Sequence, residues 1–142
     1  MNNKKYLNIY CDGGVYSHLN KCLWGFIITD NNDHVLSQSG ILNGSGGFDV
    51  ERAESEAIFQ ALKYCWEYKN NYKLYTDSKS VLDKIENKVP NATKNPNING
   101  IQELIKRIQT SLDPCSVTLY YCKRRSNEWM RKVDDLVNKV NL

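Results

Sequence analysis

The sequence predicts a single α/β domain in which one mixed β-sheet carries helices on its faces. Segments rich in aromatic and β-branched residues, separated by turn residues, fill the first third of the chain. From Val50 onward apolar residues recur at three- and four-residue spacing, and such helical segments then alternate with short strands. A length of 142 residues fits one domain and leaves no room for two.

Three strands are expected at the start of the chain. Lys5–Cys11 has a strand-like composition and stops at Asp12-Gly13-Gly14, which predicts a turn. Cys22–Asp30 predicts the second strand, and Asn31-Asn32-Asp33 predicts a hairpin turn because Asn and Asp tolerate left-handed backbone angles. His34–Ile41 pairs naturally with the second strand, so we expect an antiparallel meander.

The middle of the chain predicts a helix, a strand and a second helix. A glycine-rich segment, 43–47, predicts a flexible loop, and Val50–Tyr68 then has the spacing of an amphipathic helix. Lys73–Thr76 predicts a short strand that ends at Asp77-Ser78, and either of these residues can cap the next helix. That helix carries apolar residues within 81–85.

The last part of the chain predicts a loop, a helix, a strand and a helix. Val89–Asn99 contains two prolines and four asparagines and predicts a loop, followed by a helix at Ile101–Leu112. Ser116–Cys122 predicts the last strand and Glu128–Val140 the last helix. Because the fourth and fifth strands follow helices, we expect them to join the sheet in parallel through right-handed crossovers.

Composition excludes several classes of protein. The longest apolar run, Cys22–Ile28, is far shorter than the roughly 20 residues that span a bilayer, and no signal peptide precedes it. Five irregularly spaced cysteines predict reduced thiols in a cytoplasmic protein rather than disulfides or a zinc site. A net charge of +3 permits a nucleic-acid partner without demonstrating one.

Four acidic residues lie where an enzyme built on such a sheet could use them. Asp12 closes the first expected strand and Asp77 the fourth, so both emerge at one sheet edge if these strands are parallel neighbours. Glu54 lies in the first turn of the first long helix, and Asp134 lies beside the apolar stripe of the last. Converging carboxylates repel one another and imply a hard divalent cation. Taken singly, each also fits a turn, cap or surface position.

The segments that carry these acids resemble motifs of a known family. Asp12 ends a strand motif, Glu54 rather than Glu56 fits an Ala-Glu-x-x-Ala-x-x-x-Ala-Leu helix, and Asp134 rather than Asp135 fits the motif of the last helix. The matching segments are Ile9–Gly14, Trp24–Phe26, Ala53–Leu62, Leu74–Ser78 and Val133–Val137. Together and in this order they resemble type 1 ribonuclease H over nearly the whole chain.

The resemblance implies a fold, a reaction and a set of cofactors. It implies one ribonuclease H domain over residues 1–142, with a five-stranded mixed sheet whose first three strands are antiparallel and whose strands 1, 4 and 5 are parallel. It also implies a monomeric endonuclease that hydrolyses the RNA strand of RNA–DNA hybrids and leaves 3′-hydroxyl and 5′-phosphate ends. Two Mg²⁺ or Mn²⁺ ions would be held by the catalytic residues Asp12, Glu54, Asp77 and Asp134.

Further residues would contact the substrate if the resemblance holds. Backbone groups near Gly13 and Gly14 would meet 2′-hydroxyls, and Ser78 would lie beside them. Lys123, Arg124 and Arg125 replace the loop histidine found in many family members and could contact phosphate. The basic tract that follows contains Trp129, which could stack on a base or pack in the core.

One departure from the family keeps alternatives open. The family has an Asn-rich stretch before its catalytic glutamate helix, whereas Phe48–Arg52 here contains Asp49 and Glu51 and no Asn. Added negative charge should weaken phosphate binding or change how the minor groove is contacted. A nuclease of this fold with another nucleic-acid substrate, or a hybrid-binding module without catalysis, remains an alternative.

Overall fold

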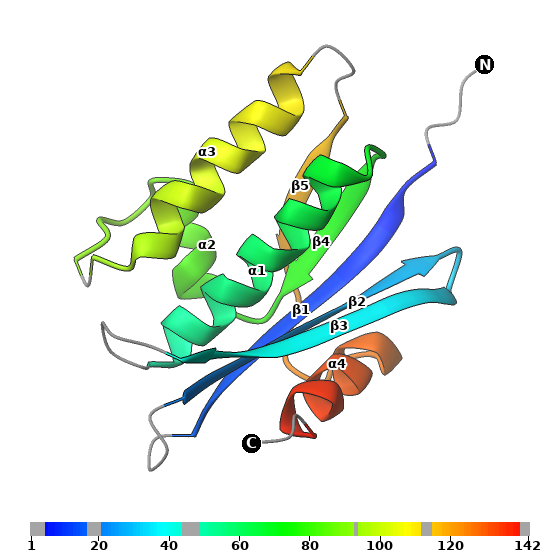
Figure 1. The fold of residues 1–142 in the computed structure, drawn as a ribbon, viewed down its shortest axis with the longest axis horizontal. Coiled ribbons are helices and arrows are strands. Elements are labelled where there is room, and N and C mark those ends of the chain that lie inside the picture. The colour runs from blue at the N-terminus through cyan, green and yellow to red at the C-terminus, as the bar shows by residue number, and fades with distance from the viewer. Residues whose placement is uncertain (1–4, 17–20, 44–48, 93, 112–114, 140–142) are drawn as a thin grey trace.

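Five strands form one sheet in the order β3-β2-β1-β4-β5 in the computed structural model (Figure 1), which describes residues 5–16, 21–43, 49–92, 94–111 and 115–139. The strands are β1 (Leu7–Tyr16), β2 (Lys21–Asp30), β3 (Asp33–Asn43), β4 (Tyr72–Thr76) and β5 (Val117–Tyr121). Neighbours among the first three are antiparallel, whereas β4 runs parallel to both β1 and β5. The predicted mixed sheet is therefore confirmed.

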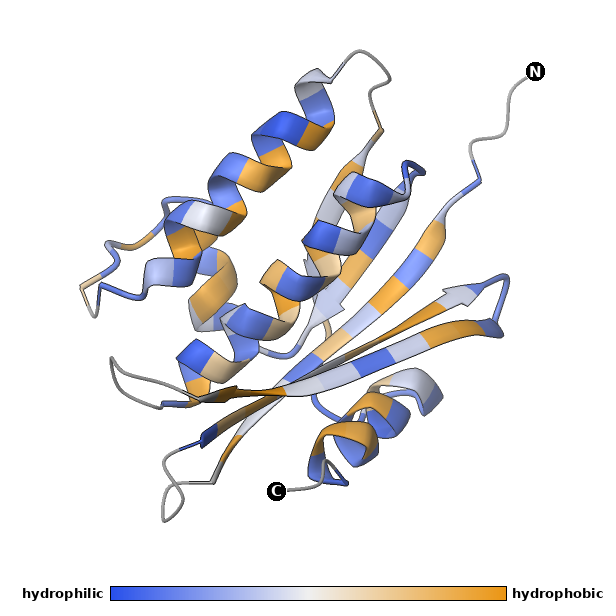
Figure 2. Cartoon of the chain, in the orientation of Figure 1, coloured by the Kyte–Doolittle hydropathy of each residue, from blue (hydrophilic) through white to orange (hydrophobic). Residues whose placement is uncertain are grey.

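Helices cover both faces of this sheet (Figure 1). The helices α1 (Val50–Glu67), α2 (Lys79–Ile85) and α3 (Pro96–Thr110) lie on one side, and α4 (Glu128–Asn138) lies on the other. Figure 2 shows orange apolar stripes on α1 and α3 beside blue polar ones. Among the described residues, no helix is both long and apolar enough to cross a membrane.

Alternation along β1 separates two hydrophobic cores. Ile9 and Cys11 are fully buried in the larger core, beneath α1 and α3. Tyr10 points to the opposite face and packs against the smaller core, which contains Trp129 of α4. Since side chains alternate along a strand, Asp12 points to the α4 side as well.

The structure corrects the expected end of the first strand. We predicted a turn at Asp12-Gly13-Gly14, but β1 continues through these residues to Tyr16. Strand β2 pairs with it along the whole length, with Gly13 opposite Trp24 and Gly14 opposite Leu23. The partner strand supplies hydrogen bonds that outweigh the weak strand preference of glycine.

The third helix begins earlier than predicted, because Pro96 can start a helix as well as break one. Asn95 caps α3 by accepting a hydrogen bond from the backbone N–H of Asn97, and Pro96 occupies the start of the helix. The expected turn between β2 and β3 is confirmed, with left-handed φ values of 51° at Asn31 and 68° at Asn32. Most of the predicted loop 43–47, and the predicted helix ends at 112 and 140, lie outside the described residues.

Candidate active site

The register of the parallel strands brings two of the predicted acids together. Cys11 of β1 is paired with Thr76 of β4, so Asp12 and Asp77 follow side by side on neighbouring strands. Asp12 is buried, with 6% of its surface exposed, and lies within β1 rather than at its end. Asp77 follows the last residue of β4, as predicted.

Helices α1 and α4 bring the other two acids to the same place. Glu54 lies just after the first turn of α1, slightly later than predicted, and Asp134 is buried in the middle of α4 with 5% exposure. All four carboxylates line one cavity of about 180 Å³. The remaining lining residues are Gly13, Gly14, Val50, Arg124, Val137 and Asn138.

Gly13 allows Glu54 to approach the sheet this closely. A Cβ atom at Gly13 would lie 2.3 Å from the carbonyl carbon of Ala53 and 2.5 Å from the backbone nitrogen of Glu54. Those distances are far below van der Waals contact, so only glycine lets β1 meet the backbone of α1 here. At Gly14 the nearest atom to a Cβ would be a Val137 methyl group at 3.6 Å, an ordinary contact.

Crowding changes the acidity of the four groups. Burial, hydrogen bonding with Asp134 and the charge of Asp77 raise the pKa of Asp12 to about 8. Burial raises the pKa of Glu54 to about 7, although a hydrogen bond from the Ser78 side chain opposes this rise. Burial also raises the pKa of Asp77, against the opposing charge of Arg124. Burial is the largest cause of all three rises, and the charge of a neighbouring carboxylate adds to each.

Two loop arginines balance part of that charge. Arg125 donates from Nη1 to Oδ2 of Asp134 at 2.6 Å and to Oδ1 of Asp135 at 3.0 Å. Arg124 lies farther away, with its Nη2 3.4 Å from both Asp134 carboxylate oxygens. Burial alone would raise the pKa of Asp134, but the bonds with Arg125 and Asp12 hold it below its ordinary value. Lys123 lies in the same loop with an exposed side chain and does not line the cavity.

The donor set fits a hard divalent cation. Oδ1 of Asp77 is buried and has no hydrogen-bond partner among the described residues, so an oxygen ligand is available there. All four acids offer oxygen atoms, which Mg²⁺ and Mn²⁺ prefer. As their side chains stand, no three Asp, Glu, His or Cys groups in the described chain converge on one metal position. Cation binding would therefore require rotation of these side chains.

A buried ion pair beside the site was missed by sequence reasoning. Nζ of Lys84 in α2 donates to Oε1 of Glu51 at 2.5 Å, and the Lys84 side chain is 9% exposed. The charge of Glu51, which we expected to oppose phosphate, is thus largely compensated within the protein. The available signal was the position of Lys84 beside the apolar residues 81, 82 and 85 of its helix.

A buried polar cluster that joins α1 to α3 was also missed. The Ser55 hydroxyl accepts hydrogen bonds from Nδ2 of Asn95 at 2.9 Å and from Nδ2 of Asn97 at 3.1 Å. Ser55 is fully buried and follows Glu54 directly. The cluster therefore holds the start of α1 in place, and with it Glu54.

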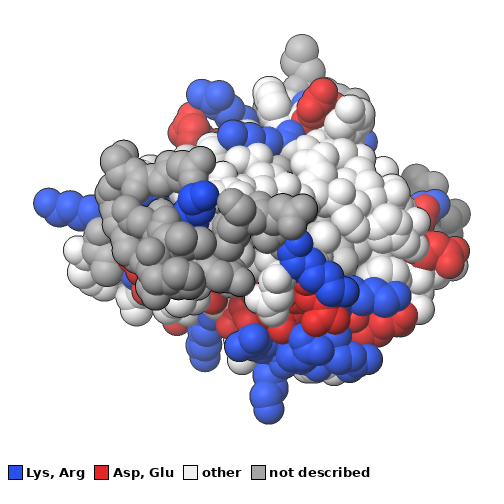
Figure 3. Space-filling view, turned by 60° about the horizontal axis from the view of Figure 1, so that its bottom comes forward, with Lys and Arg blue, Asp and Glu red and all other residues white. Residues whose placement is uncertain are grey.

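Trp129 packs in the core, which is one of the two alternatives that the sequence left open, and it is not placed to stack on a base. Only 7% of its surface is exposed, and its Nε1 donates to Oδ1 of Asn32 at 2.6 Å. Its ring stacks on Tyr10 with centroids 6.4 Å apart. Figure 3 shows Lys and Arg side chains interspersed with Asp and Glu over the charged lower part of this face.

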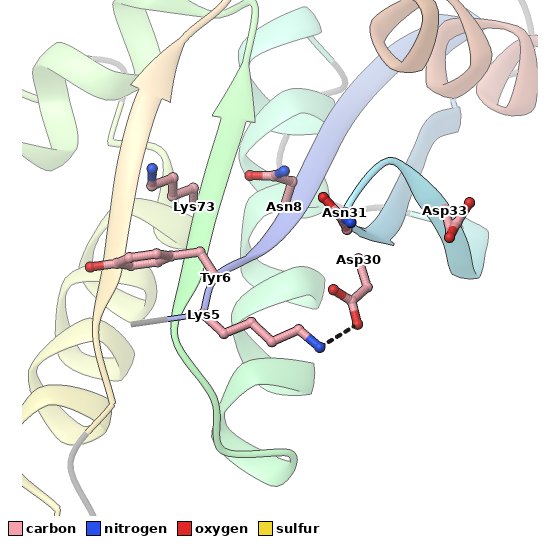
Figure 4. A pocket seen from close by; sticks show the side chains of 7 residues that line it. All are labelled: Lys5, Tyr6, Asn8, Asp30, Asn31, Asp33 and Lys73. Atoms are coloured by element: carbon pink, nitrogen blue, oxygen red, sulfur yellow. Dashed lines mark ion pairs between the residues drawn. The ribbon is translucent and has the colours of Figure 1, made fainter. Parts of the chain in front are cut away.

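A cavity larger than the one lined by the carboxylates lies away from them. About 600 Å³ in volume, it lies where β1 and β4 begin, at the end of the sheet opposite Asp12 (Figure 4). Lys5 forms an ion pair with Asp30 at 3.0 Å, and Lys73 lies over the Tyr6 ring. Its positive and negative side chains offset one another, so we do not assign catalysis to this cavity.

Comparisons with known proteins agree with the fold. The RNase H1 of the halophilic archaeon Halobacterium salinarum is 17% identical, with a TM-score of 0.72 and coverage of 94% of this chain and 96% of that one. LC11-RNase H1, solved with an RNA/DNA hybrid, is 20% identical, with a TM-score of 0.72 and 94% coverage of both chains. No curated protein sequence matches this chain. The family model for RNase H matches residues 4–140, and the chain therefore belongs to the RNase H family.

Proposed function

We propose that this protein is an endonuclease that hydrolyses the RNA strand of RNA–DNA hybrids. The observation that carries the proposal is the convergence of Asp12, Glu54, Asp77 and Asp134 on one cavity. Membership of the RNase H family indicates a nuclease, and a structural relative was solved with an RNA/DNA hybrid. No Ser, Cys or His nucleophile is needed for such a reaction.

The four acids would hold two Mg²⁺ or Mn²⁺ ions. Bound metal would activate water for in-line attack on the scissile phosphate and stabilise the leaving 3′ oxygen, which gives 3′-hydroxyl and 5′-phosphate ends. Asp12 must give up a proton to act as a ligand, because its raised pKa keeps it largely protonated at neutral pH. Asp77 offers the unpartnered Oδ1, and Ser78 orients Glu54 through its hydroxyl.

Substrate contacts are proposed on two sides of this cavity. Backbone groups of Gly13 and Gly14 would meet the 2′-hydroxyls that distinguish RNA from DNA, with Ser78 close by. Arg124 and Arg125 at the cavity, and Lys123 beside it, would neutralise phosphates. We further propose that the protein acts as a monomer in the cytoplasm, where thiols stay reduced; no disulfide joins its five cysteines, all of which lie in the described part of the chain.

Cleavage of an end-labelled hybrid tests the proposal. Wild type, Asp77→Asn and the control Asp83→Asn, which removes an acid from the adjoining helix but outside the cavity, are compared with Mg²⁺, Mn²⁺ or chelator. We expect internal cuts in the RNA strand alone, lost with chelator and with Asp77→Asn but not with Asp83→Asn. Circular dichroism shows that each variant is folded.

The alternative functions give different results in the same assay. A panel of single-stranded RNA, duplex RNA and branched DNA is cut in parallel with the hybrid. Preferential cleavage of one of these would replace the hybrid with another nucleic-acid substrate. Tight hybrid binding without cleavage in either metal would indicate a binding module.

A further inference from the structure

The loop between β5 and α4 holds Arg125 in a defined direction. The backbone N–H of Ser126 and its hydroxyl both donate to the Lys123 carbonyl, at 3.1 and 2.5 Å. Asn127 caps α4 by accepting from the backbone N–H of Met130 at 2.8 Å. Between these anchors Arg125 adopts a left-handed φ of 56°, which is costly for a residue with a Cβ. The loop thus retains an unfavourable backbone conformation at the residue whose side chain reaches the site.

The Arg125 guanidinium bridges two adjacent carboxylates of α4. Its Nη1 lies 2.6 Å from Oδ2 of Asp134 and 3.0 Å from Oδ1 of Asp135. The Asp134 side chain is 7% exposed, whereas those of Arg125 and Asp135 are 43% and 51% exposed. The short bond to a buried carboxylate is the stronger of the two, because water screens the exposed partner more.

Asp134 is also one of the four proposed metal ligands. Asp134 also interacts with Asp12, and both line the cavity in which we place the metal ions. A guanidinium within 2.6 Å of Oδ2 occupies a direction from which a cation would approach that oxygen. A guanidinium and a divalent cation at the same carboxylate oxygen would repel each other, so each weakens the binding of the other.

We propose that Arg125 is an internal counter-ion that competes with divalent metal for Asp134. This inference rests on the proposed function, since it needs the carboxylates to bind metal. Without metal, the guanidinium neutralises Asp134 and stabilises the crowded site. When metal binds, Arg125 leaves Asp134 and keeps its contact with exposed Asp135, from which it can meet a substrate phosphate. By thermodynamic linkage, the ion pair between Arg125 and Asp134 weakens metal binding by the same factor by which bound metal weakens the ion pair.

Metal titration without substrate tests this competition. Mg²⁺ affinity is measured by calorimetry for wild type, Arg125→Ala, Arg125→Lys and the control Lys123→Ala. Alanine keeps the Cβ, so it leaves the backbone cost at position 125 in place and removes only the guanidinium. Lys123→Ala removes the same charge from the same loop. Arg125→Ala should bind Mg²⁺ about tenfold more tightly than wild type. The Mg²⁺ affinity of Arg125→Lys should lie between those of Arg125→Ala and wild type. Lys123→Ala should change the Mg²⁺ affinity by less than about twofold.

The outcomes separate the inference from the function on which it rests. Weaker or unchanged Mg²⁺ binding by Arg125→Ala would overturn the competition and make Arg125 a residue that orients Asp134 for the metal. An equal gain with Lys123→Ala would also overturn it, because general loop charge would then explain the effect. If none of the four proteins bound Mg²⁺ while all were folded, the proposed metal-dependent function would itself fail.

Discussion

Replacement of Gly13 by alanine should separate β1 from α1 and disable the site without touching a carboxylate. The added methyl group would lie 2.3 Å from the Ala53 carbonyl carbon and 2.4 Å from its oxygen. Carbon atoms pack at roughly 3.5–4.0 Å, so strand and helix must move apart by about 1 Å or more. Backbone rather than a flexible side chain blocks the methyl group, so the strain cannot be relieved by a rotamer change.

The expected cost follows from that movement. Overpacking a close-packed core costs about 1–3 kcal/mol, and backbone obstruction places Gly13→Ala at about 3 kcal/mol or more. For a domain of this size that lowers Tm by about 10 °C. Glu54 would move with α1, and a misplacement of about 1 Å can reduce catalysis about a hundredfold.

Gly14→Ala is the matched control for this prediction. Its Cβ would meet only a Val137 methyl group at 3.6 Å, so we expect a Tm within a few degrees of wild type. Thermal unfolding followed by circular dichroism and hybrid cleavage in Mg²⁺ are measured for all three proteins. A Gly13→Ala protein with wild-type Tm and activity would refute the argument that backbone proximity positions Glu54.

Three other perturbations test the electrostatics and the polar contacts. Because the folded-state pKa of Asp12 is raised to about 8, the metal-free fold binds an extra proton and should lose stability between about pH 4 and 8. Asp12→Asn should remove the part of this loss that Asp12 causes, while Glu54, whose pKa is raised to about 7, keeps its own part. The variant should gain about 1–3 kcal/mol of unfolding free energy at pH 8 and lose cleavage; an unchanged pH dependence in urea unfolding would contradict this. Lys84→Ala leaves Glu51 without its ion-pair partner and should cost about 1–3 kcal/mol by the same measurement. The control Lys88→Ala removes an exposed ion pair and should leave the unfolding free energy nearly unchanged. Ser55→Ala removes the acceptor shared by two buried amide groups, which keep only the longer contacts with the backbone carbonyls of Glu51 and Arg52 at 3.4 and 3.5 Å. It should cost about 1–2 kcal/mol, and a loss below about 0.5 kcal/mol would mean that the carbonyl contacts suffice.

The convergence of Asp12 and Asp77 could be predicted because it depends on local patterns and one topological rule. Each acid follows a recognisable strand, and right-handed crossovers make those strands parallel neighbours. The continuation of β1 through Gly13 could not be predicted in this way. It depends on the partner strand β2 and on the close approach of α1, both of which are tertiary.

The burial and the partners of individual side chains could be predicted less well from the sequence than the helices and strands could. Trp129 lies in a basic tract that suits either a surface or a core position, and only the docking of α4 against Tyr10 decides between them. The sequence suggests that Glu51 is an unpaired surface acid, yet Lys84 of α2 forms an ion pair with it. Composition does not separate the tyrosines either: Tyr72 is buried, whereas Tyr120 and Tyr121 are 40% and 53% exposed because β5 is an edge strand.

The position of Asp134 on α4 has a consequence for how the protein is made. Asp12 lies near the start of the chain and Asp134 near the end of the described part, on the last helix of the sheet's second face. A nascent chain therefore carries three of the four carboxylates long before the fourth emerges from the ribosome. Until α4 docks, the cavity lacks the wall that carries Asp134. If the four acids hold metal as proposed above, a chain without a docked α4 should lack the complete metal site and leave a hybrid uncut.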